Sequence, residues 1–237
     1  RVRSELDALQ GLRTGHVEIA TVSGVTTDLL PGVLEQLRER YPRVTVGVTS
    51  LGSQAIPDAV TSGQADIGLA FALPRTADLQ QLGVGHFRLG AIVAPGHPLA
   101  ERRDVSFATC AEYPLILAKS DLSIHHLLAP LLARTRPRHK APLETSSVEL
   151  ALQMAKRGAG VAFQTRIGIE AELANGTLVH VPLNDGGSVF SDLGVYVRSS
   201  RYLPVAVDAF VRALSEEIAI REAAQGTSSS RTAPQQR

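Results

Sequence analysis

Residues 44–66 constrain the fold more than any other part of the chain. Val44, Val46 and Val48 alternate with polar residues, which is the pattern of a half-buried strand. The polar turn Leu51-Gly52-Ser53-Gln54 follows, then an apolar helical stripe that ends at Gly63, and then the start of a second strand. A turn between a strand and a helix places a hydroxyl and free backbone N–H groups at the helix N-terminus, where a small anion can bind.

The same alternation runs through the whole N-terminal part. Strands are expected at 17–22, 44–49 and 67–72, with helices at 29–37 and 55–60 between them. We expect Thr26, Thr27 or Asp28 to cap the first of these helices. Strands that alternate with helices of this length predict a parallel sheet with right-handed crossovers. The predicted fold class is therefore α/β.

The remainder is less regular, but it adds enough elements to suggest a second lobe. Strands are expected at 89–94, 115–118, 160–163, 178–181 and 193–197, and helices near 127–132, 148–155 and 207–218. Residues 225–237 are rich in Ser, Gln and Thr and are expected to be disordered. At the other end, residues 1–14 carry an apolar seam typical of a helix, which is either the end of a longer connector or an ordinary first helix.

Composition excludes several classes of protein. The chain has 237 residues and a net charge of +1, so nothing suggests a nucleic-acid binder by charge alone. The single cysteine, Cys110, forms no internal disulfide and fits a reducing cytoplasm. No apolar run approaches the roughly 18 residues of a membrane span, and residues 1–7 do not resemble a signal peptide. We therefore expect a cytoplasmic protein without a membrane partner.

Motifs for catalysis, metals and cofactors are missing. Gly158-Ala159-Gly160 lacks the third glycine of a dinucleotide fingerprint and precedes a strand instead of following one. No nucleophile elbow and no Walker phosphate loop occur. His125 and His126 are adjacent on a predicted helix, so their side chains diverge by about 100° and do not readily share a metal. We expect no catalytic residue, no metal site and no cofactor.

Several short patterns, taken in order, resemble one known family. They are Gly15-His16-Val17-Glu18-Ile19-Ala20, Leu29-Leu30-Pro31, Tyr41-Pro42-Arg43-Val44, Gly63-Gln64-Ala65-Asp66-Ile67-Gly68, Pro95-Gly96-His97-Pro98-Leu99, Gly158-Ala159-Gly160-Val161-Ala162 and Asn175-Gly176-Thr177-Leu178. They occur in the family's order over residues 15–215, and together they resemble the effector-binding region of LysR-type transcriptional regulators.

The resemblance implies two Rossmann-like lobes joined by two crossover strands, as in type 2 periplasmic binding proteins. Lobe one would comprise residues 16–86 plus 190–218, and lobe two residues 87–189. Residues 1–14 would be the end of the linker helix through which the family dimerises, which implies a homodimer or homotetramer. The helix-turn-helix that contacts operator DNA in the family is absent from this sequence.

The resemblance also implies an effector cleft between the lobes. The matching positions are Ser23, Gly24, Thr26, Ser53, Gln54, Phe71, Lys119, Ser147, Phe163 and Gln164. Two helix N-termini facing one cleft favour a carboxylate on physical grounds as well. Alternatives stay open: Ser23 and Ser53 can cap helices, Phe71 can belong to the core, and Lys119 can be a solvated charge. The segment Phe163-Gln164-Thr165 departs from the family, where a proline is frequent.

The leading hypothesis is therefore a domain that senses a small, anionic metabolite and controls transcription. A secreted solute-binding protein of the same fold is the rival, and it would be an exported monomer. An enzyme on this bilobal fold is a third class, but the sequence offers no acid, base or nucleophile set for it. Fold analogy alone does not decide between these classes.

Overall fold

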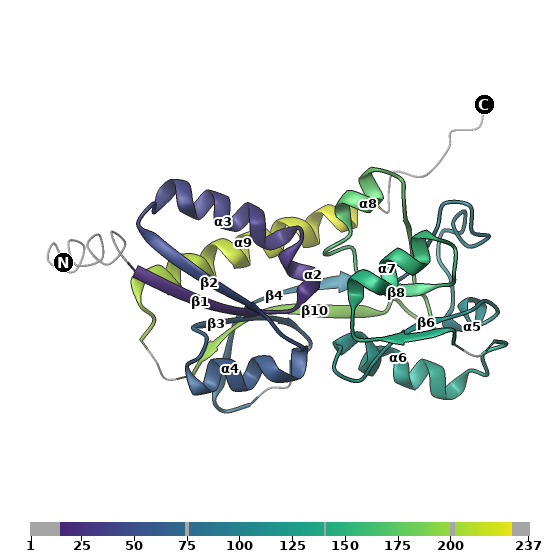
Figure 1. The fold of residues 1–237 in the computed structure, drawn as a ribbon, viewed down its shortest axis with the longest axis horizontal. Coiled ribbons are helices and arrows are strands. Elements are labelled where there is room, and N and C mark those ends of the chain that lie inside the picture. Colours follow the sequence, from purple (N-terminus) through teal and green to yellow (C-terminus); the bar gives the residue numbers. More distant parts are fainter. Residues whose placement is uncertain (1–14, 74–75, 140, 200–201, 229–237) are drawn as a thin grey trace, which may run out of the picture.

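The computed structural model describes residues 15–73, 76–139, 141–199 and 202–228, and it places two lobes side by side (Figure 1). The sheet of the first lobe has the strand order β2-β1-β3-β10-β4. Its strands are β1 (Gly15–Thr21), β2 (Val44–Ser50), β3 (Ile67–Phe71), β4 (Leu79–Arg88) and β10 (Phe190–Arg198). Strand β1 pairs in parallel with β2 and β3, as the βαβ pattern predicts, whereas β10 is antiparallel to both β3 and β4.

Helices cover both faces of this sheet. They are α2 (Ser23–Thr26), α3 (Leu29–Arg40), η1 (Ser53–Ala55), α4 (Ile56–Ser62) and α9 (Val205–Ser228). Figure 1 shows α3 and α9 on one face and α4 on the other. Strand β3 is buried at all five positions, because a central strand covered on both faces has no side chain that points to solvent.

Strand β4 is the main element that the sequence analysis missed. It carries Gly83 and Gly85, and the pattern of its buried residues is irregular. The glycines let α9 approach closely: a Cβ atom on Gly83 would lie 2.4 Å from Ser215 Oγ, and one on Gly85 would lie 2.4 Å from Ile218 Cγ2. Since glycines lower the local tendency to form a strand, β4 depends on its pairing with β10.

The second lobe contains β5 (Gly90–Val93) between β8 (Ala162–Gln164) and β9 (Val179–Pro182), with antiparallel pairing on both sides. Strand β6 (Ile116–Ala118) pairs in parallel with β7 (Leu143–Thr145), and a bridge from Leu115 to Val161 connects them to β8. The helices are α5 (Phe107–Cys110), α6 (Ser123–Arg134), α7 (Val148–Lys156) and α8 (Glu170–Ala174). Cys110 is fully buried in this lobe, as expected for a small core residue.

Two crossover segments connect the lobes. One runs from β4 to β5 and the other from β9 to β10, and they meet at Leu89. The N–H of Leu89 donates to Val189 O at 2.8 Å, and the N–H of Leu183 donates to Leu89 O at 2.9 Å. The predicted class, two α/β lobes joined by two crossover strands, is confirmed. The proposed lobe bounds, 16–86 plus 190–218 and 87–189, stay a prediction.

The helix starts differ from the capping that the sequence suggested. Ser23 and Ser53 occupy the first helical positions, so Val22 and Gly52 are the N-cap residues, and neither cap makes a side-chain hydrogen bond. Asp28 is at the N-cap position of α3, but its carboxylate does not bond to the helix. The physical reason is that Asp28 has stronger partners elsewhere, which are described below.

The C-terminal helix is also longer than expected. Helix α9 continues to Ser228, so the tail predicted to be disordered from residue 225 is helical over 225–228. Gln225 explains the extension, because its side-chain oxygen accepts from the N–H of Arg88 and its amide donates to His86 O. Residues 229–237, like the predicted linker helix at 1–14, lie outside the described residues.

None of the helices in the described part of the chain combines the length and the apolar composition that a membrane span requires.

Candidate functional site

A cavity of about 260 Å³ lies between the two lobes. The first lobe contributes the ends of β1, β2 and β3 with the starts of α2 and η1, and the second lobe contributes the starts of α6 and α7 with the end of β8. The lining residues are Val22, Ser23, Gly24, Ser50, Leu51, Gly52, Ser53, Phe71, Asp121, Leu122, Ser123, Ile124, Ser146, Ser147, Val148, Glu149 and Gln164. Its size is close to that of the smaller ligand pockets in proteins.

The cavity brings together six of the ten residues that the sequence analysis singled out. They come from segments far apart in the chain and comprise Ser23, Gly24, Ser53, Phe71, Ser147 and Gln164. In parallel α/β sheets, ligands bind beyond the carboxyl ends of the strands. The ends of β1, β2 and β3 lie at this cavity, so this cavity is the candidate site.

The other four residues lie outside the lining. Thr26 donates its hydroxyl hydrogen to Ser23 O at 2.6 Å, so it fixes the turn of α2. Gln54 donates from Nε2 to Ser120 O at 3.0 Å and therefore connects the lobes at the rim. Phe163 stacks on Phe107 in the core of the second lobe, with ring centroids 5.3 Å apart, and Lys119 is exposed.

Ser53 and Gln164 are buried polar residues that face the cavity. Ser53 is only 6% exposed, and its hydroxyl has no hydrogen-bond partner among the described residues. Gln164 is 4% exposed; its Oε1 accepts from the N–H of Thr165 at 3.0 Å, whereas its Nε2 bonds to no described residue. Neither group has a partner among the described residues, so both can form a hydrogen bond with a ligand in the cavity.

The first turns of α2 and η1 add backbone donors. The N–H groups of Ser23, Gly24 and Ser53 bond to no other group in the described part of the chain, as is usual at the start of a helix. The Ser23 hydroxyl also has no partner among these residues. Because α2 has four residues and η1 has three, the N–H groups themselves, and not a long helix dipole, provide the polarity.

Two acidic residues in the lining were missed by the sequence analysis. Asp121 precedes α6, and Glu149 lies in the first turn of α7. Among the described residues that line the cavity there is no Lys, Arg or His. A sequence signal did exist, since each acid lies close to the predicted start of a helix. Such acids commonly serve the helix itself, so only the packing of the lobes shows that they face a cavity.

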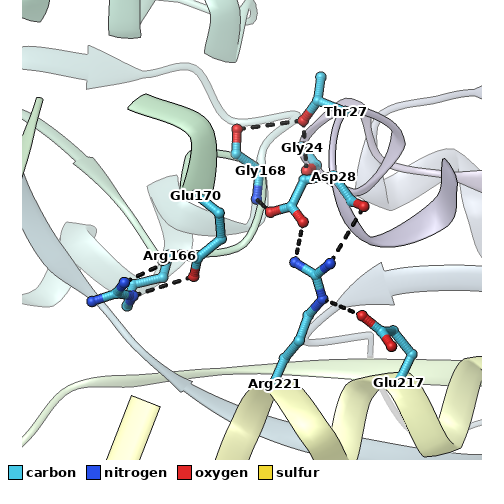
Figure 2. A network of polar contacts seen from close by, with 8 residues as sticks. All are labelled: Gly24, Thr27, Asp28, Arg166, Gly168, Glu170, Glu217 and Arg221. Carbon is cyan, nitrogen blue, oxygen red and sulfur yellow. Dashed lines mark hydrogen bonds and ion pairs between the residues drawn. The ribbon is translucent and has the colours of Figure 1, made fainter. Parts of the chain in front are cut away.

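A polar network beside the cavity holds the lobes together (Figure 2). Asp28 at the start of α3 accepts from the N–H of Gly168 in the second lobe at 3.0 Å and forms an ion pair with Arg221 of α9. Arg221 also donates to Glu217 at 2.7 Å. Thr27 donates its hydroxyl hydrogen to Gly168 O at 3.3 Å. The contacts of Asp28 explain why it does not cap α3.

Burial perturbs two titratable groups of the second lobe, Cys110 and His180. Burial raises the pKa of the Cys110 thiol to about 12, so it stays protonated and unreactive. Burial, assisted by the positive charge of Arg166, lowers the pKa of His180 to about 4, and nearby backbone carbonyls oppose this shift. No three His, Cys, Asp or Glu side chains gather as metal ligands within the described ranges.

Comparison with known proteins gives consistent results. The family model for the LysR substrate binding domain matches residues 10–219. The chain is 24% identical over 220 residues to a protein of Trichormus variabilis named as a probable RuBisCO transcriptional regulator, with 90% of this chain and 65% of that protein covered. A Synechocystis protein of the same name is 26% identical over 215 residues, which cover 87% and 61%. The chain thus spans less than two thirds of these relatives.

Solved structures share the fold. HinK, a LysR family transcriptional regulator from Pseudomonas aeruginosa, superposes with a TM-score of 0.75 at 20% identity, covering 92% of this chain and 74% of HinK. The CcmR regulatory domain of Synechocystis PCC6803 in complex with 2-PG gives 0.74 at 19% identity, covering 86% and 97%. The effector binding domain of QuiR in complex with shikimate gives 0.71 at 15% identity, covering 86% and 96%. From the match of the family model over most of its length, this chain belongs to the LysR substrate binding domain family.

Proposed function

We propose that this chain is the effector-binding and oligomerisation domain of a LysR-type transcriptional regulator. The observation that carries the proposal is the interlobe cavity with its unpartnered, buried Ser53 and Gln164 side chains. The relatives named above as transcriptional regulators support it over a secreted solute-binding protein or an enzyme. The protein acts in the cytoplasm as a homodimer or homotetramer, and operator DNA is bound by a helix-turn-helix outside this chain.

The effector is a small molecule with one carboxylate. We place the carboxylate beside Ser23 and Gly24, where the Nε2 group of Gln164 lies next to the backbone N–H groups: a Cβ atom on Gly24 would be 3.6 Å from it. These are neutral donors from both lobes, so a bound carboxylate would connect the lobes through hydrogen bonds. Shikimate, bound by QuiR, has the size and the carboxylate that such a site would accept.

Regulation follows from the two-lobe architecture. The crossover segments at Leu89 and Val189 are the covalent connections between the lobes, so a small change there reorients one lobe against the other. A ligand that contacts both lobes shifts this equilibrium only by its difference in affinity for the two arrangements. The altered arrangement would change the geometry of the oligomer and hence the spacing of the DNA-binding domains.

The test begins with a thermal-shift panel of small carboxylates that contains shikimate, pyruvate, benzoate and the L-amino acids. At least one should stabilise the protein, since a ligand that binds only the folded state raises its stability. Calorimetry on that compound should then show Kd raised about 3- to 10-fold by Ser53→Ala, the value of one neutral hydrogen bond.

The stability of the unliganded protein provides a second readout. Because the Ser53 hydroxyl has no partner among the described residues, Ser53→Ala should not destabilise the unliganded protein. Ser62→Ala, on the exposed face of α4, is the control for binding and should leave Kd unchanged, since it removes only a 3.3 Å hydrogen bond to Ala59 O away from the cavity. A panel in which nothing stabilises the protein, or an affinity that Ser53→Ala does not alter, would refute the proposed site.

A further inference from the structure

The wall of the cavity that comes from the second lobe carries two carboxylates on one short segment. Ser146 donates its hydroxyl hydrogen to Asp121 Oδ1 at 2.9 Å, and Ser147 donates to Glu149 Oε2 at 3.0 Å. Because Ser146 and Ser147 are consecutive, their Cα atoms are about 3.8 Å apart. The hydrogen bonds therefore hold both acids at the start of α7, on the same side of the cavity.

Asp121 also reaches the first lobe. A Cβ atom on Gly52 would lie 3.3 Å from Asp121 O and 4.0 Å from Asp121 Oδ2. The second carboxylate oxygen therefore lies beside the Gly52-Ser53 turn and has no hydrogen-bond partner among the described residues. This turn is the one at which the sequence suggested an anion, but a carboxylate already placed there repels a second negative charge.

The charges of the lining are not balanced. Asp121 and Glu149 are both acids, and none of the described lining residues is a Lys, Arg or His. Ser53 is only 6% exposed, and its hydroxyl faces the same space without a partner among the described residues, so it can accept a hydrogen bond. A group with positive charge and several donors would satisfy these acceptors together.

We propose that the effector carries a protonated amine that binds between Asp121, Glu149 and Ser53. This inference rests on the proposed function of the cavity as the effector site. With the carboxylate beside Ser23 and Gly24, the effector is then a zwitterion of the amino-acid class. A neutral polyol would satisfy the hydroxyls but leave both carboxylate charges unbalanced, and a phosphorylated molecule would be repelled by them.

Matched pairs of compounds test the amine directly. L-Leucine is compared with 4-methylpentanoate, and 5-aminopentanoate is compared with pentanoate. The panel also contains the other L-amino acids, shikimate and 2-phosphoglycolate. Thermal shift selects the compounds that bind, and calorimetry measures their Kd. At least one amino compound should bind, and its partner without the amine should bind about tenfold more weakly or worse.

Conservative variants test the placement of the amine. Asp121→Asn keeps the oxygen that accepts from Ser146, and Glu149→Gln keeps the one that accepts from Ser147, so both remove charge without removing the hydrogen bonds. Asp121→Asn should raise Kd for the amino compound about tenfold, because Asp121 is half-buried. Glu149 is exposed, so Glu149→Gln should raise Kd less, about 2- to 5-fold. Glu144→Gln is the control, since Glu144 is exposed on β7 and does not line the cavity.

The outcomes separate this inference from the proposed function. If shikimate or another acid without an amine binds as tightly as every amino compound, the inference is overturned, but the effector site stands. An affinity for the amino compound that neither Asp121→Asn nor Glu149→Gln changes would also overturn it. If no member of the panel binds, the inference and the proposed function both fail.

Discussion

Replacing Gly168 with alanine should weaken the contact between the lobes beside α2. Gly168 has a φ of +86°, and a Cβ atom there would lie 2.2 Å from Gly24 O and 2.9 Å from Gly24 C. These are backbone atoms of the first lobe, so no side-chain rotation can relieve the overlap. The loop that carries Gly168 must therefore move away from α2.

The cost has two parts. The left-handed conformation itself costs an alanine about 1–2 kcal/mol. The movement also stretches the hydrogen bond from Gly168 to the Asp28 carboxylate, worth about 1.5–3 kcal/mol for a charged partner, and the one from Thr27, worth about 0.5–1.5 kcal/mol. Asp28 keeps its ion pair with Arg221 (Figure 2), which limits the loss. We expect Gly168→Ala to lower the free energy of unfolding by about 3–5 kcal/mol.

Gly186 provides a control with nearly the same backbone conformation. Its φ is +85°, but a Cβ atom there would have no neighbour within 4 Å. Gly186→Ala should therefore cost only the conformational part, about 1–2 kcal/mol. Urea unfolding followed by circular dichroism measures both variants. Equal losses of stability in the two variants would refute the reasoning, because the clash with Gly24 would then have no energetic effect.

Two further predictions concern the pH dependence of stability and the packing of α9. The pKa of His180 is about 4 in the folded protein and 6.5 in the unfolded chain. The folded state is therefore fully stable with respect to this residue above pH 6.5 and loses stability as the pH falls toward 4, because the unfolded chain binds the proton more readily. Urea unfolding should show about 2 kcal/mol less stability at pH 5 than at pH 7 from this residue. His180→Gln should remove that part of the slope, and an unaltered slope would contradict the assignment. Gly85→Ala should lower the free energy of unfolding by about 1–3 kcal/mol through overlap with Ile218. Gly96→Ala is the control: a Cβ atom there meets open space, so the melting temperature should change little. Similar melting temperatures for the two variants would show that β4 and α9 are not closely packed.

Much of the architecture could be predicted because its determinants are local. The stripes of apolar residues before Gly63 and after Thr27 specify amphipathic helices, and the alternation at Val44 specifies a strand. Strand β4 could not be predicted in this way, because Gly83 and Gly85 serve the approach of α9 and weaken the local strand signal.

The candidate site was predicted in part for the same reason. Ser23 and Ser53 follow strands whose carboxyl ends must lie at one edge of the sheet, and the local pattern reveals that. Their role in capping was a wrong alternative, since both occupy the first helical position. Gln54 and Thr26 lie next to the right segments but point to partners other than the cavity.

Local sequence patterns specify the alternation of strands and helices, the resemblance to LysR effector domains, and the hydroxyl-rich turns that follow the first strands. These properties depend on residues close together in the chain. The chemistry and the boundary of the cavity depend on the packing of the lobes. Asp121 and Glu149 line the same cavity as Ser53 although more than sixty residues separate them in the sequence, and Asp28 binds Gly168 and Arg221 and does not cap α3. Electrostatic and hydrogen-bonding partners are chosen by distance in space, and the packing of the two lobes sets those distances.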